Sequence, residues 1–231
     1  MAEAGLQIIN DSGTFLVSDK NPTLAFVAKG NTTLNQAHTG TEPNSQTYWR
    51  GTPALPSGHG ASVLAIRSSG FFFPDFNGKT PRYGTDVSGT VIQWYMFARP
   101  QPTSGSGAGL QVFDEAGRCT YDSEQRVGKV IQRLVTPGQP ATGSTFPQTN
   151  YTGPLFPSGK TYAAVMTGGG TRGAMLEVDP RGRPIWRLNP MISVSNRVIV
   201  KERISWWATT DTDDRFAGGG TVSLIIDVTG Y

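Results

Sequence analysis

The stretch Gly5-Leu6-Gln7-Ile8-Ile9-Asn10-Asp11-Ser12-Gly13 returns later in the chain as Gly109-Leu110-Gln111-Val112-Phe113-Asp114-Glu115-Ala116-Gly117. The two stretches share the opening Gly-Leu-Gln and the final Gly, and most other positions exchange similar residues. In each, a short apolar strand runs into a turn whose glycine can adopt a positive φ. An apolar return strand follows the first turn at residues 15–17. The sequence therefore predicts two β-hairpins of the same kind.

Three further blocks recur in the same order, which indicates a tandem duplication. Residues 53–58 return as 154–159, residues 77–79 as 181–183, and residues 89–91 as 220–222. The longer spacing of the last block places an insertion within about 188–219. We therefore predict a first β domain at 1–100, a Gly/Ser/Pro linker at 101–108 and a second β domain at 109–231. Convergence of turn motifs in glycine-rich β proteins is the alternative explanation of the repeats.

The composition favours an all-β fold, with each unit a β-sandwich or barrel-like domain. The 231 residues include 29 Gly and 16 Pro, and only 16% are charged, which argues against a coiled coil or helical bundle. An aromatic content of 10% and a net charge of +3 argue against disorder. Short apolar runs separated by turn residues are typical of sandwiches and barrels.

The expected strands follow these apolar runs. Residues 63–66 and 71–73 are predicted to form a hairpin around 67–70, and 163–166 with 175–178 a second hairpin around 167–170. Residues 91–97 and 222–228 are the predicted closing strands. The apolar residues of 127–134 have helical spacing, but Gly128 lowers helix propensity, so we favour a strand there.

Neither membrane insertion nor nucleic-acid binding is expected. The chain has no run of about 18 apolar residues, and its start has neither the basic nor the apolar region of a signal peptide. The arginines that lie closest together, Arg181, Arg183 and Arg187, are separated by glycine, proline and tryptophan. Phosphate binding draws its affinity from many clustered cations, and such a cluster is missing from this sequence.

Two glycine-containing segments resemble phosphate-binding loops only in part. Gly159-Lys160-Thr161 has the end of such a loop, but the preceding Gly153 is one residue too far away and two prolines intervene, so a turn is predicted. Gly168, Gly170 and Gly173 match a dinucleotide fingerprint, but a strand rather than a helix is expected after them. We predict a hairpin loop there and no cofactor.

No set of residues indicates a catalytic or metal centre, so the chain is predicted not to be an enzyme. His38 and His59 lack metal-ligand spacing. Cys119 occupies the position of Phe15 in the first repeat, which predicts a buried apolar side chain rather than a nucleophile. An acidic loop lacks the Gly and Glu that a calcium-binding loop requires, and ion binding there stays open: Asp211, Asp213 and Asp214.

Aromatic doublets are the strongest candidates for an interaction surface. Neighbouring residues of a strand point to opposite faces, so one ring of each doublet can fill the core while the other contacts something else. That contact could be a second sheet, the sister domain, another subunit or a ligand. The candidate interface or ligand residues are Tyr48, Trp49, Trp94, Trp206 and Trp207.

The two hairpin sequences resemble the start of small β-rich proteins of long-tailed bacteriophages, which begin with a Gly-Leu-Gln-hydrophobic-x-Asn/Asp-x-x-Gly hairpin. The resemblance implies a structural component of the tail tip or baseplate, or a tail-fibre-associated protein, made in the host cytoplasm and located in the virion. It also implies association with the tail-tip hub and fibres, a homo-oligomer in a trimeric or hexameric setting, and contact with a bacterial surface receptor. Members of that family carry one copy of the hairpin, so two copies are a departure.

Two functions of different class are therefore expected. The first is a structural, assembling tail protein that turns over no substrate. The alternative is a carbohydrate- or receptor-binding β module that uses exposed aromatic rings.

Overall fold

The computed structural model describes residues 7–9, 15–18, 22–39, 47–60, 62–74, 80–102, 109–135, 151–168, 172–173, 187–206 and 222–231. All regular structure in these ranges is β-strand, and every described strand pairing is antiparallel, as the all-β prediction requires. Within the same ranges no helix is long and apolar enough to span a membrane.

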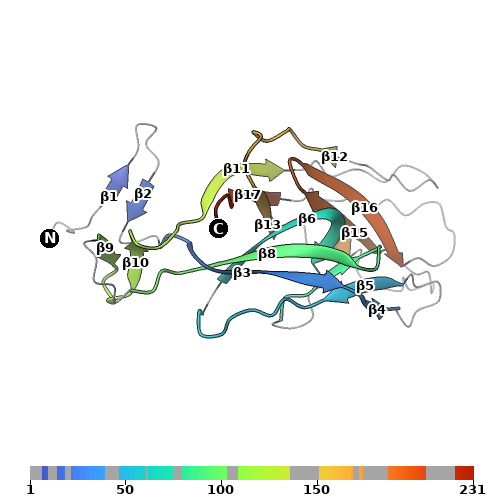
Figure 1. Cartoon of the computed structure of the whole chain (residues 1–231), viewed down its shortest axis with the longest axis horizontal. Helices are drawn as coiled ribbons and strands as arrows, with labels where there is room; N and C mark the ends of the chain where they lie inside the picture. The colour runs from blue at the N-terminus through green and yellow to red at the C-terminus, as the bar shows by residue number, and fades with distance from the viewer. Residues whose placement is uncertain are drawn as a thin grey trace, which may run out of the picture.

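The strands form two small hairpins and one large connected sheet (Figure 1). The hairpins are β1 (Gln7–Ile9) with β2 (Phe15–Ser18) and β9 (Gln111–Phe113) with β10 (Cys119–Asp122). The strands of the large sheet are β3 (Ala25–Leu34), β4 (Gln36–His38), β5 (Tyr48–Gly51), β6 (Ser62–Pro74), β7 (Tyr83–Thr85), β8 (Thr90–Ala98), β11 (Lys129–Val135), β12 (Tyr151–Thr152), β13 (Tyr162–Gly168), β14 (Arg172–Gly173), β15 (Arg187–Val194), β16 (Val198–Trp206) and β17 (Val222–Asp227).

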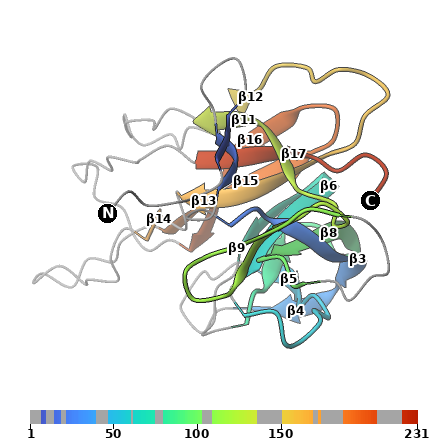
Figure 2. The ribbon, with the colours of Figure 1, turned by 90° about the vertical axis from the view of Figure 1, so that its left-hand side faces the viewer.

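The long strand β6 connects the two halves of the large sheet. Six strands lie in the order β11-β17-β13-β6-β8-β3. Read inward from the two edges, β11-β17-β13 of the second half of the chain corresponds to β3-β8-β6 of the first half. Beyond them, β6 pairs with β7, which leads to β5 and β4, and with β15, which leads to β14, β16 and β12. Figure 2 shows how the halves of the large sheet are arranged: strands β11, β12, β15 and β16 of the second half lie above β3, β4 and β5 of the first half.

The predicted hairpin around residues 67–70 is wrong, because β6 passes through it as a single strand. Ser68 and Phe72 pair with β15, so the polar residues between the two apolar runs stay in the sheet. The Ser68 hydroxyl donates to the Val91 carbonyl at 2.9 Å and accepts the Gly70 N–H at 3.1 Å. Ser68 and Gly70 therefore lie where the neighbour of β6 changes from β8 to β7, and the chain does not reverse its direction there.

Three strand pairings recur in the second half of the chain with the same register. In the hairpins, Gln7 pairs with Ser18 and Ile9 with Phe15, and the residues 104 positions later, Gln111 with Asp122 and Phe113 with Cys119, pair in the same way. The β3–β8 and β11–β17 ladders correspond residue by residue, including the position of a β-bulge. The β6–β8 and β13–β17 ladders correspond as well, except at their last pair, where β13 has a β-bulge between Met166 and Gly168.

Strands β3 and β11 are the two edge strands of this six-stranded order. They meet only near their first residues, through a short contact that we call the seam. Ala25 at the start of β3 forms a bridge with Val127, just before β11. The Phe26 N–H donates to the Arg126 carbonyl and the Gly128 N–H to the Leu24 carbonyl, both at 2.7 Å. In the described residues the pairing goes no further along the two strands, and the sheet is not a closed barrel.

Apolar clusters cover both faces of the central strands. Trp94 and Met96 of β8 belong to one cluster with Ile66, Ala164 and Ile225. The alternate residues Tyr95 and Phe97 belong to the other, with the following side chains: Ala65, Ala163, Val165, Ile226 and Val228. Strand β8 is therefore buried on both faces by its own chain, which is why its sequence is apolar without alternation.

Several other sequence predictions are confirmed. Strands occur at 7–9, 15–18, 111–113 and 119–122, and the closing strands lie at 90–98 and 222–227. Residues 129–135 form strand β11 and not a helix. The turn at 10–14, the linker residues 103–108 and the strand expected at 175–178 lie outside the described residues.

Candidate interaction surfaces

The two hairpins lie next to each other at one end of the molecule, far from β15 and β16 (Figure 1). The chain before β3 anchors the second hairpin, because the Thr23 N–H and hydroxyl both donate to the Thr120 carbonyl, at 2.8 and 3.0 Å. The buried Thr120 hydroxyl in turn donates to the Val112 carbonyl at 3.1 Å. The second hairpin, β9–β10, is thus fixed to the segment that leads into β3.

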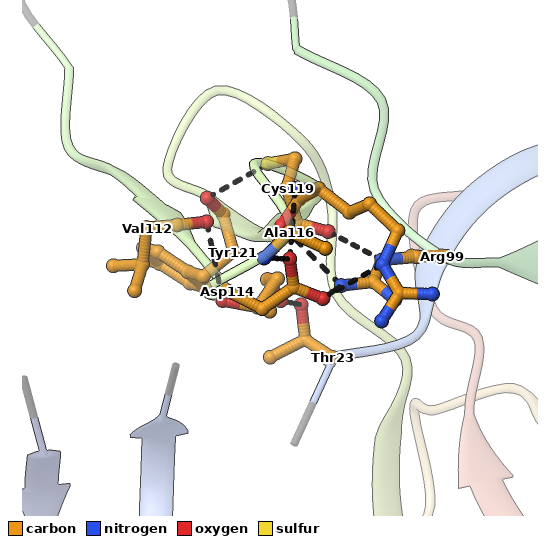
Figure 3. A network of polar contacts seen from close by, with 9 residues as sticks. Thr23, Arg99, Val112, Asp114, Ala116, Cys119 and Tyr121 are labelled. Atoms are coloured by element: carbon orange, nitrogen blue, oxygen red, sulfur yellow. Dashed lines mark hydrogen bonds and ion pairs between the residues drawn. The ribbon is translucent and has the colours of Figure 1, made fainter. Parts of the chain in front are cut away.

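The turn of the second hairpin is organised by Asp114 (Figure 3). Its Oδ1 accepts the N–H groups of Ala116 and Arg118 at 3.0 and 2.9 Å. Gly117 has a φ of +71° and donates its N–H to the Asp114 carbonyl at 2.9 Å. The acidic and glycine positions of the motif are therefore the ones that the turn geometry requires.

Arg99, which follows β8, ties this turn to the large sheet. Its Nη2 lies 2.7 Å from Asp114 Oδ2, and its Nε donates to the Cys119 carbonyl at 2.8 Å. Arg118 Nε contacts the same carboxylate oxygen at 2.8 Å. A carboxylate shared by two guanidinium groups fixes the orientation of the hairpin through charge-assisted hydrogen bonds.

Cys119 is buried beneath this network, as its correspondence with Phe15 predicts. Its thiol donates to the Tyr121 carbonyl at 3.2 Å. Burial raises the pKa of the Cys119 thiol, which favours its protonated form.

We expect the hairpin anchor to weaken in acid. The Arg118 N–H, together with the side chains of Arg99 and Arg118, lowers the pKa of Asp114 to about 2. In the unfolded chain an aspartate has a pKa of ~4. The stabilisation of the hairpin by ionised Asp114 is therefore complete above that pH, and it is lost as the pH falls toward the pKa of Asp114 in the folded protein. The protection of the Ala116 and Arg118 amides, expressed relative to their intrinsic exchange rates, should therefore fall between about pH 4 and pH 2. Asp114→Asn should exchange faster at neutral pH and show no such acid step; an identical acid step in Asp114→Asn would contradict this assignment.

The hairpin also exposes apolar side chains. Leu110 is 43% and Phe113 42% exposed, while Val112 between them is buried. An apolar pair on a rigidly held, projecting hairpin is suited to contact with another protein surface.

The predicted aromatic residues do not form one surface. Tyr48 of β5 is half-buried and contacts the His38 ring edge-to-face at 4.9 Å and the Phe73 ring at 5.4 Å. Trp49, also half-buried, occupies the opposite face of β5 and pairs with Ala37 and Thr85. Strand β5, which carries both residues, lies far from the hairpins, at the opposite end of the molecule (Figure 1).

The other three predicted aromatic residues have different places. Trp94 is only 5% exposed and belongs to the core. Trp206 ends β16, and the structure describes its backbone alone, while Trp207 lies outside the described residues. Trp94 is therefore a structural residue in this chain, because the sheet buries both faces of β8.

In the part of the chain that the structure describes, no cluster of metal-ligating side chains is found. No group of three His, Cys, Asp or Glu side chains in that part could hold a metal ion. Gly159 lies in a turn with a φ of +79°, as predicted, and Lys160 pairs with Asp227 at 2.9 Å. Burial alone would raise the pKa of Asp227, but hydrogen bonds from Thr229 and Lys160 lower it to about 2. Gly170 and the acidic loop at 211–214 lie outside the described residues.

Sequence reasoning missed Arg99 and Thr23 as anchors of the hairpin. Their partners are distant along the chain, 97 residues in the case of Thr23 and Thr120. No local pattern signals such a contact. A comparison of the chain with models of protein families, with curated proteins and with solved structures found no match.

Proposed function

We propose that this protein is a structural component of a bacteriophage tail tip or baseplate that assembles with other tail proteins through its two hairpins. One observation carries the proposal: the motif that resembles the start of such proteins occurs in two hairpins of identical register that lie side by side. The second of them is anchored through Asp114 and exposes Leu110 and Phe113. The virion is then the place of action, and synthesis takes place in the host cytoplasm.

Tandem duplication of one β unit is part of this proposal. The equal registers of three ladders and the mirrored order β3-β8-β6 and β11-β17-β13 support it. Residues 1–100 and 109–231 are the two units in this proposal. The hairpin β15–β16, which begins the insertion expected at 188–219, pairs with β6 of the first unit and joins the units further.

Association with tail proteins is expected to depend on the exposed hairpin side chains. Phe113→Asp should weaken binding to purified hub or fibre proteins by about tenfold or more, since buried aromatic anchors dominate interface energies. Val87→Asp is the matched control, because Val87 is 61% exposed in the loop between β7 and β8. Biolayer interferometry with both variants measures the difference. Equal affinities for the wild-type chain and Phe113→Asp, or no binding to any tail protein, would refute the proposal.

Homo-oligomerisation in a trimeric or hexameric setting is the accompanying expectation. Native mass spectrometry of the purified chain, alone and with tail partners, gives the number of copies directly. A monomer in both samples would contradict it.

A carbohydrate- or receptor-binding module is the second candidate function. It is favoured by the half-buried Tyr48 and Trp49 of β5, with His38 against the Tyr48 ring. Partly exposed rings can stack on a sugar. Binding on a glycan array that Trp49→Ala abolishes would support this candidate, and an array without signal would exclude it for the glycans displayed.

A further inference from the structure

Residues 228–231, which follow β17, form a short segment that we call the strap. Its base is held beside the start of β13, because the Val228 N–H donates to the Thr161 carbonyl and the Thr161 N–H donates to the Thr229 hydroxyl, both at 2.8 Å. The Thr229 N–H also donates to Asp227 Oδ1 at 3.1 Å, at the end of β17. The base of the strap is therefore fixed to strands of the second half of the chain.

Tyr231, the last residue of the strap, lies over the seam and contacts both of its sides. Its ring packs edge-to-face against Phe26, with the ring centroids 4.9 Å apart, and against Phe97 at 5.9 Å. Its hydroxyl donates to the Val127 carbonyl at 2.6 Å, and the guanidinium of Arg126 lies 5.9 Å from the centre of its ring. Because the two phenylalanines belong to the first half and the other two residues precede β11, one side chain joins the two sides of the seam.

Two basic side chains hold the backbone of the strap from the same two sides. Arg126, which precedes β11, donates from Nη1 to the Gly230 carbonyl. Lys29 of β3 donates from Nζ to the carbonyl of Tyr231. Charge-assisted hydrogen bonds of this kind are stronger than neutral ones. The tip of the strap is therefore attached both to β3 and to the segment that leads into β11.

The pair of rings that Tyr231 contacts has no equivalent in the second half of the chain. The corresponding ladders place Val130 and Ile226 at the positions of Phe26 and Phe97. Neither residue carries a ring, and Val130 is 47% exposed. The two halves therefore differ at this position, and the first half alone offers a tyrosine an aromatic contact there.

The seam leads directly into the anchor of the second hairpin. In the seam the Gly128 N–H donates to the Leu24 carbonyl at 2.7 Å. The residue before Leu24, Thr23, donates to the Thr120 carbonyl of β10 through both its N–H and its hydroxyl. The chain order places Thr23 on the β3 side of the seam and Thr120 on the β11 side. A separation of the two sides would therefore also break the contacts between Thr23 and Thr120.

We infer that the strap is a latch that controls whether the seam and the anchor of the second hairpin are closed. With Tyr231 seated on the two rings both are closed, and with Tyr231 released both open while the rest of the sheet stays paired. Among the described residues the seam consists of one bridge with its two backbone hydrogen bonds, and so small a unit can open without unfolding of the whole sheet. The inference concerns the position of the hairpin and does not depend on the tail-protein proposal.

Two variants of Tyr231 test the latch in the full chain. Tyr231→Ala removes both ring contacts and the hydrogen bond to Val127, and it should accelerate amide exchange at Phe26 and Gly128 by about tenfold or more. Tyr231→Phe keeps the ring and removes only the hydroxyl, so exchange at the same amides should accelerate by about fivefold, as for the loss of one hydrogen bond. Circular dichroism and thermal unfolding establish that both variants stay folded.

Cys119, the single cysteine of the chain, reports the opening of the hairpin anchor. Its buried thiol lies in β10, next to Thr120. In Tyr231→Ala, labelling of this thiol by a maleimide should accelerate by about the same factor as amide exchange in the seam and at Thr23, because one opening exposes all three.

Tyr48→Ala is the matched control. Tyr48 is half-buried like Tyr231 and also contacts two rings, those of His38 and Phe73, but it lies on β5. Its loss lowers the stability of the closed and the open seam alike, so seam exchange and labelling of Cys119 should be as in the wild type.

Three results would overturn the inference. Acceleration of both readouts by Tyr48→Ala would mean that global unfolding exposes these groups. Unchanged seam exchange in Tyr231→Ala would show that the strap does not hold the seam closed. Faster seam exchange with unchanged labelling of Cys119 would show that the strap does not control the hairpin anchor.

Discussion

Trp94→Ala is expected to lower the free energy of unfolding by about 3–5 kcal/mol, the range for deleting a large buried aromatic side chain. The indole belongs to the larger core cluster, and its ring covers Gly30 on the neighbouring strand. A Cβ on Gly30 would lie 2.4 Å from the Trp94 ring, so the two residues are packed as a complementary pair. Alanine at position 94 leaves a cavity that the flanking strands β3 and β6 cannot collapse to fill. Urea unfolding monitored by circular dichroism measures the loss.

Trp49→Ala is the control for this effect. Trp49 is half-buried at the periphery of the sheet, so its removal should cost less than half as much as removal of Trp94. A loss equal to that of Trp94→Ala would place Trp49 in a core as well. A loss below about 1 kcal/mol in Trp94→Ala would mean that the indole is not packed as the structure has it.

The contrast between these two residues illustrates what a sequence can predict about aromatic doublets. Alternation along a strand correctly implies that Trp94 and Tyr95 point to opposite faces of β8. It does not reveal that the chain covers both faces itself. That outcome depends on β17, more than 120 positions away, and on the seam between β3 and residues 126–128.

Local geometry was predictable where short-range chemistry determines it. The hairpin at 111–122 follows from its apolar strands and from a turn that needs Asp114 and Gly117. The uninterrupted strand β6 was not predictable, because Arg67-Ser68-Ser69-Gly70 has the composition of a turn. It stays extended because β15 supplies partners for Ser68 and Phe72, and that strand belongs to the other half of the chain.

The anchor of the hairpin was likewise beyond local reasoning. The motif predicts the turn, but its attachment through Arg99 and Thr23 arises from tertiary proximity. The candidate interaction surface therefore combines a predictable element with an unpredictable attachment. This combination explains why exposed residues on that element, Leu110 and Phe113, were not singled out from the sequence.

The seam should be sensitive to any side chain at Gly128. A Cβ there would lie 3.0 Å from two carbons of the Phe97 ring and 3.4 Å from the Leu24 carbonyl oxygen. The same residue donates its N–H to Leu24, so it cannot move away without losing that hydrogen bond. Gly128→Val is therefore expected to destabilise the fold by about 1–3 kcal/mol through overpacking. Urea unfolding, with amide exchange at Phe26 and Gly128, measures both the stability and the opening of the seam.

A double-mutant cycle with Phe97 tests whether that contact is the cause. Phe97→Ala alone should cost about 3–5 kcal/mol, because its fully buried ring packs edge-to-face against Phe26 and Tyr231. In the double variant the valine occupies space that the phenyl ring has left, so the combined loss should be smaller than the sum by at least about 0.5 kcal/mol. Additive losses would show that Gly128 is required for its backbone conformation rather than for the approach of Phe97. A combined loss smaller than the sum would, by contrast, identify the seam as a packed contact between the two halves of the chain, since Phe97 belongs to β8 and Gly128 precedes β11.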